Sequence, residues 1–373
     1  MFWNNRKGAG RIKTILKIIL VLVLVVVIAA IGYLAYIMLD YSRIEDDLAL
    51  DPHGTSTNGA VTVGTKYTVV TQNLGFGAYT PEFTFFMDGG TQSWAESKES
   101  VISCIDQGAN NVKGFLPDFV FFQEVDTDST RSYHVDQSKQ LADKFDGFMY
   151  TEAVNYHSSF LMYPITQPHG FANSELMTFS KYEVASAIRR SFPISEGFSK
   201  FLDLDRCFSK SYVKVAGGDK YLVLYNVHSS AYGGSDEIRT AQMTKLFEDM
   251  QAEYEKGNYC VCGGDFNHDF TGDSKKKLNP DMDIRDDYGW AQAFPAELLS
   301  KYDITQCIEY SNEELKATCR DCDIPYKEGN FTVIVDGFLI SKNVECVDVW
   351  NRYNGFTYSD HAPVQLDFRL KAA

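Results

Sequence analysis

The feature that constrains this chain most is an uncharged, almost wholly apolar run of 22 residues, Ile18 to Leu39. At about 1.5 Å of rise per residue, a helix of this length crosses a hydrocarbon core of roughly 30 Å. A cleaved signal peptide is the alternative, but its apolar region normally holds about 7–15 residues and ends at a clear cleavage site. We therefore expect residues 18–39 to form one uncleaved transmembrane helix in a lipid bilayer.

The charges on either side of this run predict its orientation. Basic residues precede the run and acidic residues follow it: Arg6, Lys7, Arg11, Lys13 and Lys17, then Asp40, Glu45, Asp46 and Asp47. Because basic flanks stay on the cytoplasmic side, residues 1–17 are expected to be a cytoplasmic tail. The rest of the chain then lies outside the cytoplasm, and a short basic tail with a single anchor favours a bacterial cell membrane.

The net charge restricts the partners of the exported part. The whole chain of 373 residues carries a charge of −15, and removing the five basic residues of its acid-free first 39 positions leaves −20. Such a surface repels nucleic acid and anionic lipid in general. A polyanionic substrate would therefore need a local metal ion.

The eight cysteines can form disulfides in an oxidising compartment. A four-cysteine zinc site needs two pairs at the spacing of a zinc finger, and only Cys319 and Cys322 have that spacing. We favour a disulfide within the region from Cys307 to Cys346. Cys260 and Cys262 are expected to be core residues on one face of a strand.

The exported chain divides into residues 40–65, expected to be a stalk or linker, and residues 66–373, expected to be one catalytic domain. Helices are predicted within 97–109, 137–145 and 237–254, and residues 125–172 are otherwise expected to be irregular. Strands are predicted at 67–72, 119–123, 176–179, 212–215, 221–225, 260–264, 332–340, 344–350 and 364–368. Because strands outnumber helices, the pattern favours an α+β layered sandwich of mixed sheets over a doubly wound fold.

Polar side chains recur at the ends of the apolar runs. The run at Cys260 stops at two glycines, followed by Asp265 and Asn267, which lie two residues apart and so point the same way on extended chain. Each such end taken alone is most simply a turn. Taken together, carboxylates, amides and imidazoles describe a hard-cation site with an acid/base pair, suited to Mg²⁺ or Mn²⁺.

The sequence motifs at these strand ends, and their order along the chain, resemble those of the endonuclease/exonuclease/phosphatase superfamily of DNase-I-like, metal-dependent phosphoesterases. The resemblance covers about residues 65–370 and rests on six motifs: Thr71-Gln-Asn73, Phe122-Gln-Glu124, Asn226-Val-His228, Gly263-Gly-Asp265-Phe-Asn267, Val335-Asp336-Gly and Ser359-Asp360-His361-Ala-Pro-Val. It implies a four-layered α/β/β/α sandwich of two mixed sheets, with the active site at one end of the sheets.

The resemblance also implies the metal ligands. Glu124 would bind Mg²⁺ or Mn²⁺, with Asn73 beside it and Asp360 as a further ligand. The expected chemistry is attack of water in line with the leaving group, without a covalent intermediate.

The same resemblance implies the catalytic roles. Asp265 would align or deprotonate the water, and Asn267 would hold a phosphate oxygen. His361, oriented by Asp336, would stabilise the transition state, and His228 would assist the leaving group.

Two further residues are candidates for substrate binding. Arg206 is expected to reach the phosphate, although an ordinary surface ion pair is an equal alternative. Glu175 is expected to brace His228, although an exposed glutamate is the simpler interpretation. His157 and His169 are candidates for the substrate entrance.

The sequence therefore predicts a membrane-anchored, extracytoplasmic phosphoesterase that hydrolyses a phosphodiester or a phosphomonoester. A lipid head group, nucleic acid and a soluble phosphate ester remain open as substrates, and no obligate protein partner is inferred. A catalytically silent binding module of the same fold is the alternative, but such a module has no chemical need for the full set of polar residues.

Overall fold

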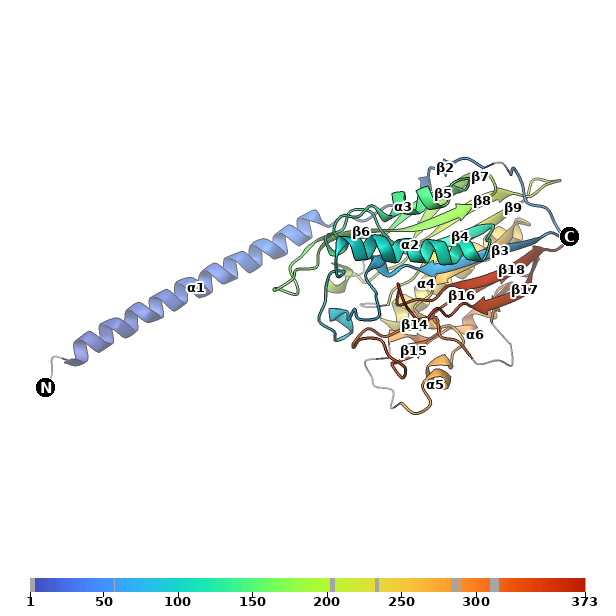
Figure 1. Cartoon of the computed structure of the whole chain (residues 1–373). Helices are drawn as coiled ribbons and strands as arrows, with labels where there is room; N and C mark the ends of the chain where they lie inside the picture. The colour runs from blue at the N-terminus through green and yellow to red at the C-terminus, as the bar shows by residue number, and fades with distance from the viewer. Residues whose placement is uncertain are drawn as a thin grey trace. The chain divides into compact units, whose positions relative to one another are not determined.

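The computed structural model describes residues 4–56, 58–201, 205–231, 235–282, 288, 290–308 and 315–372. The chain divides into two compact units, residues 1–42 and residues 43–373. The first unit consists of one continuous helix, α1 (Asn4–Asp40), drawn in Figure 1. Its stretch Gly10–Asp40 is long and apolar enough to cross a membrane and includes the predicted span 18–39.

The second unit is built on two seven-stranded mixed sheets. The first sheet has the order β1 (Leu48–Leu50), β7 (Val184–Ser191), β8 (Cys207–Lys214), β9 (Tyr221–His228), β10 (Tyr259–Asp265), β16 (Asp336–Ser341) and β13 (Ile304–Cys307). The second sheet has the order β17 (Val344–Asn351), β18 (Val364–Leu370), β3 (Lys66–Asn73), β4 (Phe119–Asp126), β6 (Gly170–Ser180), β5 (Met149–Leu161) and β2 (His53–Gly54).

Short elements complete this unit. Two small sheets pair β11 (His268–Asp269) with β12 (Gln292–Ala293) and β14 (Cys319–Arg320) with β15 (Thr332–Val333). The helices are α2 (Lys98–Gly114), α3 (Gln137–Lys144), α4 (Asp236–Glu255), α5 (Ser274–Leu278) and α6 (Ala296–Leu299). Single 3₁₀ turns are η1 (Gly75–Gly77), η2 (Phe86–Asp88), η3 (Thr130–Ser132) and η4 (Phe198–Phe201).

The core shows why the unit has four layers. Phe119 and Phe121 alternate with Val120 and Phe122 along β4, so each face of the strand is apolar. The first pair packs against the other sheet, with Phe338 among its neighbours, and the second pair packs under α2 and α3. Helix α4 covers the outer face of the first sheet. The predicted α/β/β/α sandwich is confirmed.

Residues 43–65 differ from the predicted stalk. Strand β1 pairs antiparallel with β7 and β2 pairs antiparallel with β5, so the segment adds an edge strand to each sheet. The Ile44 amide donates to Asp205 Oδ1 at 2.9 Å, and the Ser191 amide donates to Asp46 Oδ1 at 2.8 Å. Main-chain pairing at open sheet edges depends little on composition, which is why a polar stretch misled the prediction.

Residues 125–172 also differ from the predicted irregular segment. The predicted helix is present as α3, but the region also holds the 13-residue strand β5 and the start of β6. Buried and partly exposed residues alternate along β5, a period-2 pattern that its polar and aromatic side chains obscure. The strand β7, which the sequence did not suggest, lies in the other sheet.

The cysteines are free thiols in this structure, so the favoured disulfide is absent. The Cys307 thiol hydrogen-bonds Cys346, which raises the pKa of Cys307 and lowers that of Cys346. Cys260 and Cys262 are fully buried in the core beneath α4, as predicted.

Candidate active site

The pairing of the strands brings the polar strand ends to one edge of the sandwich. Strands β9 and β10 are parallel and in register, so His228 lies beside Asp265. Strand β16 runs antiparallel to β10, and Asp265 pairs with Asp336 at its first residue. In the other sheet β3 and β4 are parallel, and their pairing ends at Asn73 and Gln123. Residues far apart in the sequence therefore meet where these strands end.

The double glycine before Asp265 permits a close approach of two strands. A Cβ on Gly264 would lie 2.0 Å from the carbonyl oxygen of Val227, and the glycine has a φ of +148°. Past it, the Asn267 amide N–H donates to Asp265 Oδ1 at 2.9 Å, and the Asn267 side chain donates to the Ser229 carbonyl at 2.9 Å. The hydrogen bonds of this turn fix the orientation of the Asp265 and Asn267 side chains.

Glu124 reaches the site through a bulge in β4. The register with β6 shifts between Phe122 and Val125, and Glu124 has a φ of +54°, which is rare for a residue with a side chain. Gln123 turns between the sheets and donates to Asn226 Oδ1 at 2.7 Å. Such strain persists only where the surrounding structure imposes it, and it commonly marks functional positions.

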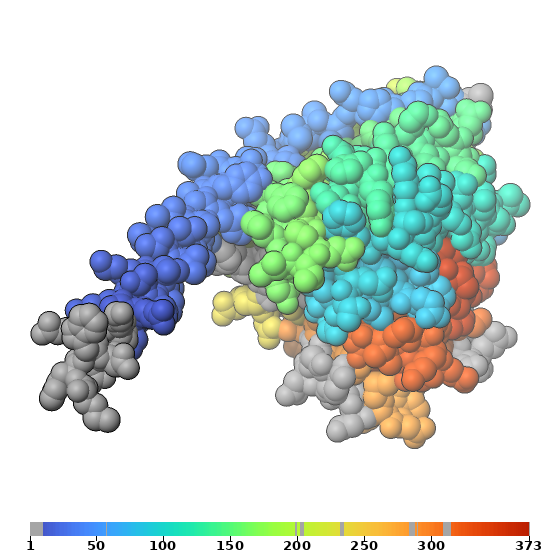
Figure 2. Space-filling model, turned by 60° about the vertical axis from the view of Figure 1, so that its left-hand side comes forward, coloured from blue at the N-terminus to red at the C-terminus, as the bar shows by residue number. Residues whose placement is uncertain are grey.

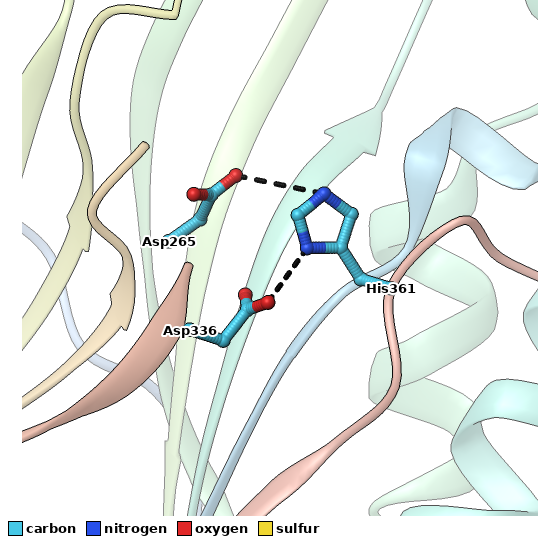
Figure 3. Close-up of side chains that lie close together, drawn as sticks. All are labelled: Asp265, Asp336 and His361. Carbon is cyan, nitrogen blue, oxygen red and sulfur yellow. Dashed lines mark hydrogen bonds and ion pairs between the residues drawn. The ribbon is translucent and has the colours of Figure 1, made fainter. Parts of the chain in front are cut away.

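His361 lies between two carboxylates, as Figure 3 shows. Its Nδ1 is 2.8 Å from Asp336 Oδ2, and its Nε2 is 3.7 Å from Asp265 Oδ2. The three side chains are buried, and one ligand-type atom of each lies within 4.8 Å of the others. Burial lowers the pKa of His361, but the negative charges around the ring, that of Asp336 foremost, outweigh burial and raise the pKa well above its ordinary value. Because both ring nitrogens face carboxylates, we interpret this cluster as an oriented imidazolium rather than as metal ligands.

His228 lies on the other side of Asp265. Its Nε2 is 3.5 Å from Asp265 Oδ2 and 3.8 Å from Glu124 Oε1. Its Nδ1 has no hydrogen-bond partner among the described residues. Burial, with smaller effects from Arg206 and His361, lowers the pKa of His228 well below its ordinary value. His228 is therefore a neutral imidazole.

Asn73 holds the carboxylates in place. Its side-chain nitrogen donates to Glu124 Oε1 at 3.2 Å and to Asp265 Oδ2 at 3.1 Å. Its oxygen accepts the Gly75 amide N–H at 2.9 Å, which fixes the orientation of the side-chain amide. Asn73 therefore positions both carboxylates, and its role as a metal ligand stays a prediction.

The remaining carboxylates have perturbed acidities. Burial raises the pKa of Asp265 to about 7, with His361 opposing the shift. Burial also raises the pKa of Asp360 to about 6, and the charge of Glu124 adds to the increase. Asp360 packs so closely on Gly75 that a Cβ there would lie 2.7 Å from its Oδ1. A divalent ion would stabilise a carboxylate whose charge is disfavoured by burial and by a neighbouring carboxylate, as that of Asp360 is.

A cavity of about 120 Å³ opens over these side chains. Of the predicted residues, those that line it are Glu124, Arg206, His228, Asp265, Asn267, Asp360 and His361, and His169 also does so. Asp336 lies behind His361. Arg206 Nη1 donates to Asn155 Oδ1 at 3.3 Å, so the structure places this arginine at the cavity rather than on an open surface.

Glu175 does not reach the cavity. Its neighbours Ser174 and Leu176 face the first sheet, so alternation along β6 points Glu175 to the opposite face. Burial, with the charges of Glu152, Asp136 and Asp126, raises the pKa of Glu175 to about 8. The expectation that it braces His228 is wrong, because one residue of register decides the face of a strand.

The structure adds two arginines that sequence reasoning missed. Arg131 lines the cavity, forms a two-pronged ion pair with Asp126 at 3.0 and 2.8 Å, and lies 3.9 Å from the centre of the Phe76 ring. Arg320 lines the cavity and is 1% exposed. Neither belongs to a motif. The short spacing between Asp126 and Arg131 was the only available signal.

Two packed sheets with a buried carboxylate and imidazole cluster at one end define a phosphoester hydrolase of the DNase-I-like class. The chain belongs to the Endonuclease/Exonuclease/phosphatase family, which matches residues 70–361. Members of this family are phosphoester hydrolases, including nucleases and phosphatases. None of the curated proteins matches the chain.

Solved structures share the fold at low sequence identity. A family member from Beutenbergia cavernae DSM 12333 is 16% identical, with a TM-score of 0.54 over 83% of this chain and 72% of its own. ANGEL2, a 2',3'-cyclic phosphatase, is 12% identical, with a TM-score of 0.53 over 87% of this chain and 99% of its own. A family protein from Leptotrichia buccalis C-1013-b is 11% identical, with a TM-score of 0.50 over 82% of this chain and all of its own.

Proposed function

We propose that this chain is a membrane-anchored, extracytoplasmic phosphodiesterase that depends on a divalent cation and hydrolyses its substrate by direct attack of water. The observation that carries the proposal is the placement of Asp265 between two imidazoles of opposite character. His361 and His228 each approach Asp265 Oδ2, at 3.7 and 3.5 Å, and their pKa values shift in opposite directions. Environments that separate the pKa values of neighbouring groups divide acid from base roles.

The residues present fit a hard divalent cation. Glu124 and Asp360 both line the cavity, and the charge of Glu124 raises the pKa of Asp360. Carboxylate oxygens in small number suit Mg²⁺ or Mn²⁺, which retain waters and take further oxygens from the substrate. When bound, the cation would supply positive charge to the phosphoryl oxygen and the leaving oxygen.

The side chains divide the proton transfers. Asp265 accepts a proton from the attacking water, and its pKa of about 7 suits a base near neutral pH. His361, held by Asp336, and the amide of Asn267 hydrogen-bond the phosphoryl oxygens as negative charge develops. His228 donates a hydrogen bond from Nε2 to the leaving oxygen. The new P–O bond comes from water and the old one breaks. The leaving alkoxide takes up a proton from solvent, so a diester yields a phosphomonoester and an alcohol.

The anchor supports the proposed location. Helix α1 contains the predicted span, and basic residues precede the span while acidic residues follow it. Residues 43–373 would then lie outside the cytoplasm. A bacterial membrane remains the expectation from the short basic tail.

The direct test is turnover of bis(p-nitrophenyl) phosphate by the full chain in detergent, with Mg²⁺, with EDTA, and with Mg²⁺ restored after EDTA. We expect hydrolysis that EDTA abolishes and Mg²⁺ or Mn²⁺ restores. Turnover that persists in EDTA would contradict the metal requirement. Absence of turnover under all conditions, with the protein folded, would favour the silent binding module.

A further inference from the structure

The connection between β5 and β6 carries an exposed apolar surface. We call residues 160–171 the hairpin tip. A large fraction of the surface of its apolar side chains is exposed to solvent: 37% for Phe160, 47% for Met162, 69% for Tyr163, 83% for Ile165 and 37% for Phe171. Residues 158–168 contain no charged side chain, although the exported chain carries −20. Contiguous exposed apolar surface on a soluble unit marks a site of interaction with a partner or a membrane.

The hairpin tip projects from the end of the sandwich. Figure 1 shows the β5–β6 connection extending beyond the strands, and Figure 2 shows this green segment on the molecular surface. The tip is supported from below: Trp94 Nε1 donates to the Pro168 carbonyl at 2.7 Å, and the rings of Phe86 and Tyr163 lie 5.8 Å apart. These contacts hold the hairpin tip, and with it the exposed apolar side chains, against the rest of the domain.

The hairpin is also part of the catalytic cavity. Asn155 and Tyr156 of β5, His169 of the tip and Ser174 of β6 all line the cavity that contains Asp265. The rings of Phe86 and His169 lie 5.7 Å apart, next to the contact with Tyr163. A surface on which the tip rests would thus lie beside the cavity.

The segment that follows the membrane anchor is bonded to the base of the same hairpin. Helix α1 ends at Asp40, and four residues later the Ile44 amide is bonded to Asp205 Oδ1. The other oxygen of Asp205 pairs with His157 of β5. At no more than about 3.6 Å per residue, the chain from Asp40 to Ile44 spans at most roughly 14 Å. The link between the anchor and this bonded segment is therefore short.

We propose that the hairpin tip rests in the interfacial layer of the bilayer that α1 spans, and that the cavity takes the head group of a zwitterionic phospholipid as its phosphodiester. This inference rests on the proposed phosphodiesterase function and on the anchor. Aromatic and aliphatic side chains without charge bind the membrane interface by burying apolar area. An uncharged tip on a strongly acidic domain suits zwitterionic lipid, because anionic lipid and nucleic acid are repelled.

The depth of the tip can be measured in the full chain reconstituted into phosphatidylcholine vesicles. Cys346 is the one exposed cysteine, so Ile165→Cys in a Cys346→Ser background accepts a fluorescent label at the tip. The matched control is Asp219→Cys, in the turn between β8 and β9 at the opposite end of the first sheet. We expect nitroxide-bearing lipids to quench the label at position 165 and not the label at position 219.

Three results would overturn the placement. Quenching at neither position would show that the tip stays in water, and equal quenching at both would show that the domain has no preferred face. Disulfide cross-linking between copies of the unlabelled Ile165→Cys variant would show that the tip binds a second chain. In each case the lipid surface is not the partner.

The substrate is tested with a double variant, Tyr163→Ser/Ile165→Ser, and a matched control, Leu116→Ser, which removes a leucine that is 79% exposed just before β4. We measure release of labelled head group from phosphatidylcholine and sphingomyelin vesicles, and from anionic phosphatidylglycerol vesicles. The double variant should release the zwitterionic head groups roughly tenfold more slowly, since two exposed apolar groups no longer bury at the interface.

Turnover of bis(p-nitrophenyl) phosphate separates the two proposals. It should be unchanged in the double variant and in the control, because neither alters a residue that lines the cavity. If the wild-type chain did not hydrolyse bis(p-nitrophenyl) phosphate, the proposed phosphodiesterase function itself would be wrong. Three results, each with normal turnover of the soluble diester, would defeat the lipid assignment alone. They are no release of head group, equal release by the wild type and the double variant, and faster release from anionic vesicles than from zwitterionic ones.

Discussion

The two histidines of the active site have similar positions and opposite electrostatics. Both are buried, and both approach Asp265 Oδ2, at 3.5 Å for His228 and 3.7 Å for His361. His361 has Asp336 at its far nitrogen, 2.8 Å away, whereas the far nitrogen of His228 has no hydrogen-bond partner among the described residues. The pKa of His361 is raised and that of His228 is lowered. Burial alone yields a neutral imidazole, and burial with a carboxylate behind the ring yields a charged one.

This difference supports the proposed roles of the two histidines. A fixed imidazolium stabilises negative charge on a phosphoryl oxygen without reorganising, because its orientation is set before the reaction. A neutral imidazole donates a hydrogen bond from its N–H to the leaving oxygen without placing a second positive charge in the site. Substitutions at these histidines and at their neighbours test this division.

Removing the charged ring should cost the most. We expect His361→Ala, and likewise Asp265→Ala, to lower kcat for bis(p-nitrophenyl) phosphate by about 10³-fold or more while the chain stays folded. Steady-state kinetics measure the loss, and circular dichroism with thermal unfolding confirms the fold. The control is His134→Ala, which removes an exposed histidine paired with Asp128. Near wild-type turnover in folded His361→Ala would refute the assignment of the site.

Asp336→Asn should make His361 resemble His228. Loss of the negative charge removes the main cause of the raised pKa, so His361 becomes neutral at lower pH. We expect kcat to fall about 10²-fold and the alkaline limb of the pH–rate profile to move to lower pH. NMR titration of His361 provides a readout independent of activity. An unchanged alkaline limb together with an unchanged His361 pKa would show that Asp336 does not maintain the imidazolium.

Glu124→Gln tests the metal half of the site, apart from either histidine. A ligand at about 100 times its Kd stabilises the fold by about 2.7 kcal/mol. We expect Mg²⁺ to raise the Tm of the wild-type chain by roughly 2–4 °C and to have a clearly smaller effect on the variant. Differential scanning fluorimetry with increasing Mg²⁺ makes the comparison, and Glu152→Gln in β5 is the control. An equal shift in wild type and Glu124→Gln would exclude this glutamate as a ligand.

The smallest effect on activity is expected for Glu175→Gln. Glu175 lies on the opposite face of β6 from the cavity, so kcat should stay within about twofold. Its folded pKa is raised to about 8 from an ordinary 4.5, so ionisation is disfavoured in the folded state. Its contribution to stability is therefore present below pH 4.5 and is lost as the pH rises through about 8.

The pH dependence of the free energy of unfolding tests the raised pKa of Glu175. The free energy of unfolding of the wild-type chain, from urea titrations, should fall more steeply between about pH 5 and about pH 8.5 than that of the variant. Parallel pH dependences would show that Glu175 is not shifted, and a large loss of activity would return it to the active site.

Much of the active site was predictable because its residues follow strongly apolar runs. A buried strand that ends in Asp265 or His228 is visible in the sequence, since the change from apolar to polar is abrupt and independent of context. The predicted helices and most predicted strands are also present, although 332–340 splits into β15 and β16. Long, clear patterns determine local structure by themselves.

The errors share a cause in non-local pairing. Residues 43–65 contain strands β1 and β2 only because β7 and β5 expose edges that accept them. Arg131 enters the cavity because Asp126 and the Phe76 ring hold it there. Glu175 faces away because the register of β6 puts Ser174 inward. None of these contacts leaves a periodic signal in the sequence.

The sequence alone determined that this chain has one membrane-length helix, a mixed sandwich domain and a set of strand-end carboxylates, amides and imidazoles, because burial of apolar runs and covalent order fix these locally. Only the tertiary structure decided how the surroundings of the two imidazoles differ, that Asn73 donates to two carboxylates, and that an apolar hairpin adjoins the cavity. Those properties depend on short distances between residues far apart in the chain, such as Asn73 and Asp265 at 3.1 Å, and such distances are set by packing.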